Sequence, residues 1–167
     1  VSSKVLLKYA ISYISFEQAM INFSKELDDV SFDELARQGK DRWEETMSQI
    51  EVQGGTLAQK RTFYTSLYRT YERMVDINEY GQYFSGYDGQ VHKSERPFYV
   101  DDWIWDTFRA QHPLRTILAP AQEEDMLHSY VEMARQSGWM PTFPGVAGNQ
   151  PCMNCYHSSA IFLDAHR

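Results

Sequence analysis

The stretch YFSGYDGQVHKSERPFYVDDWIWDTFR, residues 83–109, decides how this chain is interpreted. Its glycines around Asp88 predict a tight reversal, because glycine tolerates positive φ and aspartate can hydrogen-bond its own backbone. Farther on, Asp101, Asp102 and Asp106 alternate with tryptophans. Such pairs suit a sugar, whose C–H faces stack on aromatic rings and whose hydroxyls donate to carboxylates, whereas a buried carboxylate needs a partner. A helix with an acidic first turn and Trp105 in the core is the alternative, and both interpretations stay open on these residues alone.

Length and charge narrow the class of protein. The chain has 167 residues, which is one ordinary domain, and a net charge of −7. That charge argues against a nucleic-acid partner or an anionic membrane surface. No apolar run approaches the ~20 residues of a membrane span. Because the chain starts in a strand-like pattern and stops in a helix-like one, we expect a piece of a longer protein, whose localisation the lack of a signal peptide does not decide.

Apolar periodicity predicts a mainly helical chain. Alternation over residues 4–14 predicts a strand, and a helix with Ala19, Met20 and Phe23 on its buried face should follow. We expect a short hairpin around residues 87–89, with Pro113 and Pro120 ending helical pieces. The predicted helices cover residues 16–27, 32–50, 57–75, 101–111, 114–118, 123–136 and a segment from about 156. Helices with alternately long, irregular connections suggest an α/α toroid, which periodicity alone does not distinguish from a bundle.

Two cysteines, Cys152 and Cys155, have the C-x-x-C spacing of a redox pair or of half a zinc site with His157. A structural zinc site needs four ligands, and the sequence offers no fourth. No strand–CxxC–helix pattern of thioredoxin type surrounds the pair either. We therefore expect two unpaired thiols at the entry of a helix.

Several ordered segments resemble one known family. RPFYVDDWIWDTFR (96–109) is followed by HPLRTIL (112–118); GGTLAQKRTFYTSLYRTY (54–71) precedes them, and CMNCYHSSAIFLDA (152–165) follows. Together they resemble the catalytic domain of glycoside hydrolase family 92, the calcium-dependent exo-acting α-mannosidases. The resemblance extends over nearly the whole chain, in the same order as in the family.

This resemblance implies a fold and an activity. The family's catalytic domain is an (α/α)6 toroid preceded by a β-sandwich domain. Residues 1–15 would then be the strand at the junction, and residues 16–167 would form the N-terminal part, about half, of the toroid. The implied activity is hydrolysis of terminal α-linked mannose, with α-1,2 linkages expected, from a mannose-containing glycan. The alternatives are a non-catalytic carbohydrate-binding or interaction domain, and a different toroid glycosidase or lyase.

The implied chemistry needs groups that the chain does not contain. An inverting glycosidase uses two carboxyl groups, one protonating the leaving oxygen and one activating water. The family's acid and base lie in GNEPSH-like and GNDD-like segments, which are absent here. We therefore assign no catalytic residue and expect the isolated chain to be inactive. Most ligands of the Ca²⁺ cofactor should also lie outside the chain, so the metal-binding residues are unknown; the family further implies a secreted or periplasmic enzyme.

Sugar contacts are the roles that the resemblance transfers to these residues. Asp101, Trp105, Asp106 and Arg109 match the family's D-x-x-x-W-D-x-x-R pattern. Asp101 is the best candidate to grip mannose hydroxyls, whereas Asp106 and Arg109 favour a structural ion pair. His157 is a substrate-binding candidate that, like any lone histidine, is more often structural. Asp164, Asp88 and Arg96 are weaker candidates. The sequence departs from the family's pattern at Cys155, where the family usually has glycine.

Overall fold

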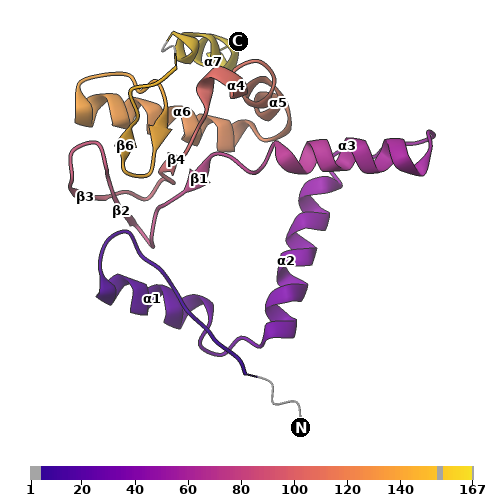
Figure 1. Cartoon of the computed structure of the whole chain (residues 1–167), viewed down its shortest axis with the longest axis horizontal. Helices are drawn as coiled ribbons and strands as arrows, with labels where there is room; N and C mark the ends of the chain where they lie inside the picture. The colour runs from indigo at the N-terminus through magenta and orange to yellow at the C-terminus, as the bar shows by residue number, and fades with distance from the viewer. Residues whose placement is uncertain (1–4, 154–155, 167) are drawn as a thin grey trace. The chain divides into compact units, whose positions relative to one another are not determined.

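The computed structural model describes residues 5–153 and 156–166, and this described part is mainly helical. It divides into two compact units, Val1–Ser48 and Gln49–Arg167 (Figure 1). Cys155 lies outside the described residues, so the C-x-x-C prediction stays untested, while Cys152 is exposed. None of the described helices has the length and apolar character that a membrane span requires.

The N-terminal unit holds two helices, α1 (Phe16–Glu26) and α2 (Phe32–Met47). Both begin as predicted, because the hydroxyls of Ser15 and Ser31 accept hydrogen bonds from the backbone N–H three residues later. The side chain of Asn22 donates to the carbonyl of Ile11 at 3.0 Å, which ties the segment before α1 to the helix.

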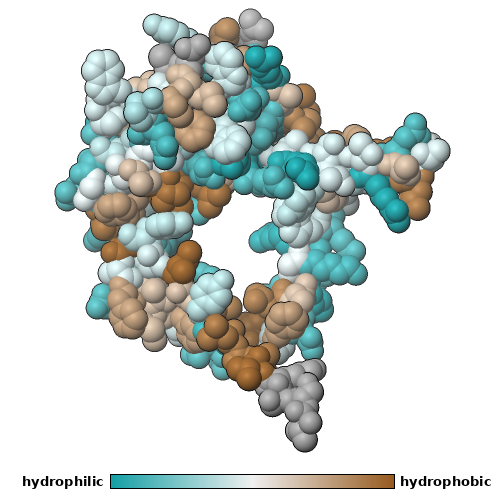
Figure 2. All heavy atoms as spheres, viewed as in Figure 1, coloured by the Kyte–Doolittle hydropathy of each residue, from teal (hydrophilic) through white to brown (hydrophobic). Residues whose placement is uncertain are grey.

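Two predictions for the N-terminal unit are wrong. The strand expected at residues 4–14 is not formed by the described residues 5–14, because a strand needs a hydrogen-bonded neighbour and the chain supplies none there. The predicted buried face of α1 is also wrong, since Met20 is exposed while Gln18 and Asn22 are buried. Hydrophobic side chains accordingly gather at the surface of this unit (Figure 2), among them Val5, Leu7, Ile11, Phe16 and Phe32.

In the C-terminal unit, α3 (Leu57–Arg69) begins in a complete capping box between Thr56 and Gln59. The helix ends before the predicted residue 75, and the chain passes into β1 (Val75–Asp76). Three short antiparallel ribbons follow in this unit. They pair β1 with β4 (Tyr99–Val100), β2 (Gln82–Phe84) with β3 (Val91–Lys93), and β5 (Pro144–Gly145) with β6 (Gly148–Asn149). The β2–β3 ribbon confirms the predicted hairpin.

Prolines change the helices after residue 101. The predicted helix over 101–111 is wrong: α4 covers only Ile104–Thr107, and α5 (Gln111–Leu118) contains Pro113 in its first turn. Proline is tolerated there because the N–H it lacks would have no intrahelical partner. Likewise Pro120 begins α6 (Pro120–Ser137), the helix predicted over residues 123–136, and α6 ends at Gly138, with φ 81°.

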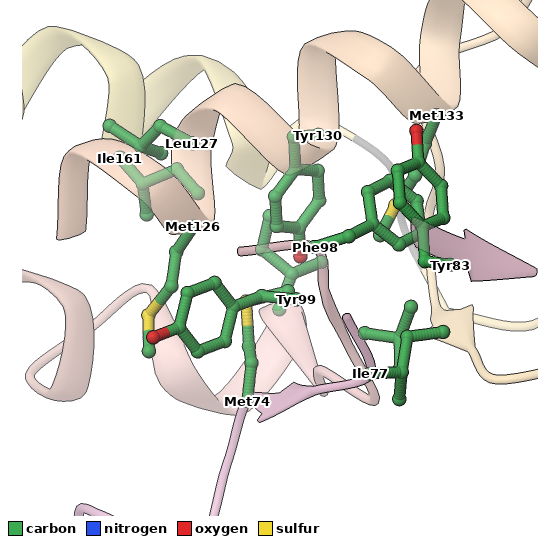
Figure 3. Close-up of a cluster of buried hydrophobic side chains, with 12 residues drawn as sticks. Met74, Ile77, Tyr83, Phe98, Tyr99, Met126, Leu127, Tyr130, Met133 and Ile161 are labelled. Carbon is green, nitrogen blue, oxygen red and sulfur yellow. The ribbon is translucent and has the colours of Figure 1, made fainter. Parts of the chain in front are cut away.

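The core of the C-terminal unit lies between the ribbons and the helices α5, α6 and α7 (His157–His166). Helices α5, α6 and α7 contact one another, and β4 packs on α6. Figure 3 shows the apolar side chains between them, where the rings of Tyr83 and Phe98 stack 3.8 Å apart. Helix α6 buries Met126, Leu127 and Tyr130 on the face toward this core. This core holds the end of β4, and with it residues 101–103, against α5 and α6.

Two glycine substitutions should have opposite effects on stability. A Cβ on Gly86 would collide with the backbone of Ala147 and lie 2.5 Å from the Gly148 nitrogen, so Gly86→Ala should destabilise the protein by roughly 1–3 kcal/mol or more. Gly39 lies in α2 with open space around it, so Gly39→Ala should stabilise it by about 0.5–1 kcal/mol. Urea unfolding of both variants measures this; equal effects would contradict the close packing at Gly86.

Candidate functional site

A network of three buried ionisable side chains lies beneath residues 101–103. His112 of α5 stands between two carboxylates, with Nε2 2.9 Å from Asp102 Oδ2 and Nδ1 2.8 Å from Glu123 Oε1. Asp102, His112 and Glu123 are 0%, 2% and 1% exposed. Asp102 also accepts hydrogen bonds from Tyr130 Oη at 2.6 Å and from Thr107 Oγ1 at 2.8 Å. The network therefore joins the end of β4 to α4, α5 and α6.

The geometry makes His112 a cation. Each ring nitrogen faces a carboxyl oxygen, and an imidazolium, which carries a proton on both nitrogens, can donate to both of them. Burial by itself would lower the pKa of His112, but the hydrogen bonds and charges of Asp102 and Glu123 raise it to about 9. Burial would likewise raise the pKa of Asp102, yet its hydrogen bond to His112 and that residue's charge, with the bonds from Tyr130 and Thr107, hold it below its usual value.

Asp101 and Trp103 lie on either side of Asp102 and reach the surface. Asp101 has a φ of 62°, a left-handed conformation that aspartate adopts more readily than most residues. Its carboxylate pairs with Arg73 Nη1 at 2.6 Å, and both side chains stay partly exposed. The Arg73 guanidinium also lies over the exposed ring of Trp103, 3.9 Å from its centroid, and that ring stacks on Phe143. We call Arg73, Asp101 and Trp103 the acid–arginine–tryptophan surface.

The other aromatic candidate, Trp105, meets His157 instead. The two rings contact edge to face with centroids 5.0 Å apart, and Phe108 lies on the same imidazole at 4.1 Å. The structure thus brings Trp105 and His157 together, as a site containing both requires. This contact also fits a structural role for His157, because its ring is packed between two aromatic side chains.

The remaining candidates lie apart from these contacts. Asp106 and Arg109 are exposed and form no ion pair with each other, so the predicted pair is wrong. The reason is that α4 ends at Thr107, and the Arg109 guanidinium instead lies 5.5 Å from the Phe108 centroid. Two of the weaker candidates form ion pairs with nearby side chains: Asp88 pairs with His92, and Arg96 pairs with Glu124 and Asp125. The third, Asp164, is exposed on α7.

The residues here do not fit a calcium site. Among the described residues, no three histidine, cysteine or acidic side chains converge in a way that could hold a metal ion. The two buried carboxylates nearest the surface residues, Asp102 and Glu123, are both bonded to a histidine that carries positive charge. A divalent cation there would be repelled by His112.

Comparison with known protein families identifies the class of protein to which this chain belongs. Residues 18–167 match the glycosyl hydrolase family 92 catalytic domain, which makes the chain a glycosidase segment. The chain belongs to glycoside hydrolase family 92. No protein with a curated description matches it.

Solved structures agree with this assignment. An inverting family 92 mannosidase from Bacteroides thetaiotaomicron is 37% identical, with a TM-score of 0.84, over 93% of this chain and 21% of its own. Another family 92 α-mannosidase from that organism is 27% identical, with a TM-score of 0.84, over 90% of this chain and 20% of its own. The same enzyme in complex with mannoimidazole gives a TM-score of 0.81 at 27% identity, with the same two shares. The chain thus spans about a fifth of the length of these mannosidases.

Sequence reasoning did not single out Arg73, His112 or Phe143. Arg73 is 28 positions before Asp101 and belongs to no motif, so only the fold brings the pair together. The one available signal was the H-P at the start of HPLRTIL: a histidine in the first turn of a helix, eleven residues before a glutamate in the next.

The network predicts a loss of stability in mild alkali. Unfolding returns His112 from a pKa of about 9 to about 6.5, so its protonation stabilises the fold fully below pH 6.5 and ceases to do so as the pH rises through 9. The total change is about 3 kcal/mol. Urea unfolding between pH 6 and 9.5 measures it.

His112→Gln is the control for this experiment, because glutamine fills the site without titrating. It should be less stable than the wild type at pH 6, and its stability should change less between pH 6.5 and 9. A wild-type stability that is flat or rises over that range would show that His112 is neutral in the folded protein.

Proposed function

We propose that this chain is the N-terminal part of the toroidal catalytic domain of an exo-acting α-mannosidase. The complete enzyme removes terminal α-linked mannose, with α-1,2 linkages the expected substrate, and inverts the anomeric configuration. The observation that carries the proposal is the acid–arginine–tryptophan surface in a chain of family 92. The inverting mannosidase among the similar structures supports the stereochemistry, and the share of its length that this chain covers supports a longer parent.

The surface has the chemistry that sugar recognition needs. The carboxylate of Asp101 can accept hydrogen bonds from two adjacent hydroxyls, and the guanidinium of Arg73 can donate to a ring or hydroxyl oxygen. Their mutual ion pair keeps both groups in place before the sugar arrives. Trp103 is exposed, and the part of its ring that Arg73 and Phe143 leave open offers an apolar contact to the C–H groups of a pyranose. Trp105 and His157, whose rings contact each other, are the further residues that we propose bind sugar.

The described residues supply binding rather than bond cleavage. Inversion requires two carboxyl groups ~6.5–9.5 Å apart, with room for a water between them. Asp102 and Glu123 do not meet this need, because both are buried and a histidine fills the space between them. We propose that the acid, the base and the ligands of the assisting calcium belong to the rest of the parent enzyme, together with a β-sandwich domain before residue 16.

Mannose release from α-1,2-mannobiose tests this proposal. The complete polypeptide that carries this chain should release mannose, and a calcium chelator should abolish the release. Residues 1–167 alone should release none. Release by the short chain would show that an acid and a base lie within it, and failure of the complete polypeptide on every mannobiose would contradict the proposed substrate.

Asp101→Asn tests the sugar-binding role within the complete polypeptide. Asparagine also accepts a left-handed φ, so the backbone should stay in place while the charge is lost. Losing a charge-assisted hydrogen bond of about 1.5–3 kcal/mol should lower kcat/KM about 10- to 150-fold. Glu95→Gln, an exposed acid in the same unit, is the matched control and should leave kcat/KM unchanged. Equal kinetics for both variants would remove Asp101 from the site.

A further inference from the structure

Arg73 and Asp101 form the charged part of the acid–arginine–tryptophan surface, yet neither lies in a helix or a strand. Arg73 lies between α3 and β1, and Asp101 directly follows β4. A pair built on two irregular segments needs an external support to keep its geometry, because loop backbone is more mobile than the elements it connects.

The first turn of α5 contacts both of these segments with consecutive side chains. Gln111 Nε2 donates to the backbone carbonyl of Arg73 at 2.7 Å. The next residue, His112, holds the carboxylate of Asp102, the neighbour of Asp101, at 2.9 Å. One helical turn thus fixes the backbone of one partner and the adjacent residue of the other.

Helix α5 also contacts α6 and the residues that follow α3. His112 Nδ1 bonds Glu123 of α6 at 2.8 Å. One turn farther along α5, the guanidinium of Arg115 donates to the carbonyl of Thr70 and lies 3.8 Å from the Tyr71 ring centroid. Three side chains of α5 therefore hold residues 70–73 and 102 relative to a helix that is packed in the core.

We propose that Gln111 and His112 are positioning residues for the sugar-binding surface, acting through the Arg73–Asp101 pair. This inference rests on the proposed function. His112 is buried, and the side-chain amide of Gln111 donates its hydrogen bond to the Arg73 carbonyl. In this proposal, therefore, neither residue contacts substrate. Their role is to fix two loops so that the carboxylate of Asp101, the guanidinium of Arg73 and the ring of Trp103 face the sugar together.

Physical reasons make such support necessary. Asp101 is held at a positive φ, which costs an L-residue roughly 1–2 kcal/mol, so its backbone relaxes when its neighbour Asp102 is released. The pair rests on the contact of Arg73 Nη1 with Asp101 Oδ1 at 2.6 Å, so a small shift of the Arg73 backbone weakens it. Misplacing a binding group by about 1 Å is enough to lower the rate of a reaction on the order of 100-fold.

The test measures the binding of mannoimidazole to the complete polypeptide that carries this chain. Gln111→Ala should weaken binding on the order of tenfold, because the Arg73 segment loses its support. The decisive arm is the same substitution in an Asp101→Asn background, where it should have little further effect, since the pair through which Gln111 acts is already broken.

Met133→Ala is the matched control, because it removes a fully buried apolar side chain of α6 from the hydrophobic core. It should lower the melting temperature at least as much as Gln111→Ala and leave mannoimidazole affinity unchanged. Equal loss of affinity from Gln111→Ala in the wild-type and Asp101→Asn backgrounds would overturn the proposal, as would wild-type affinity for Gln111→Ala.

A second readout separates this proposal from the proposed function. The carboxyl carbon of Asp101 should change its ¹³C chemical shift in Gln111→Ala and in His112→Gln, without any sugar present. If that shift moves while Asp101→Asn binds mannoimidazole like the wild type, the positioning stands and the sugar-binding role of the pair fails. If the shift stays at its wild-type value in both variants, the positioning is wrong.

Discussion

The placement of one protonated histidine between two buried carboxylates supports the organisation of the C-terminal unit. Burying Asp102, His112 and Glu123 singly would be costly, and only their mutual hydrogen bonds and charges make the burial tolerable. Because the three residues come from the end of β4, from α5 and from α6, their contacts define how these elements meet. Removing His112 would leave two carboxylates without a partner charge in the core, which is more damaging than an apolar cavity of similar size.

The same network determines what the neighbouring residues can do at the surface. Asp102 points inward and is held by three donors, so Asp101 and Trp103 on either side are directed outward. Arg73 completes the surface because Gln111, beside His112, holds its carbonyl. The buried charges thus serve as the support, and the exposed ones as the groups available to a ligand. On the proposed function, these exposed groups are the part of the chain that contacts sugar.

Local signals predicted the elements whose ends are determined locally. The predicted helix starts at residues 16, 32 and 57 are correct, because the capping residues Ser15, Ser31 and Thr56 lie directly before them. The strand at residues 4–14 failed, since pairing requires a partner that periodicity cannot reveal. The helix at 101–111 failed for a different reason: proline was read as a stop at position 113, although it fits a first turn.

The candidate site was predictable only where a motif carried it. Asp101, Trp105 and His157 were found through resemblance, and the contact of the last two follows from the packing of α7 on α4. Arg73 and His112 were not, because their partners lie far away in the sequence. No periodic pattern marks a residue whose importance comes from one tertiary hydrogen bond. Such residues emerge only once the helices are placed.

The measurement that tests this account most directly is the ¹⁵N NMR spectrum of His112 with labelled imidazole, recorded at pH 7.5 in the complete polypeptide that carries this chain. The account predicts that both ring nitrogens are protonated, with the chemical shifts of an imidazolium, at a pH where an ordinary histidine is neutral. A spectrum with one protonated and one bare nitrogen would contradict it. The proton would then lie on Glu123 or be absent, and the buried network would not be the ionic support described above.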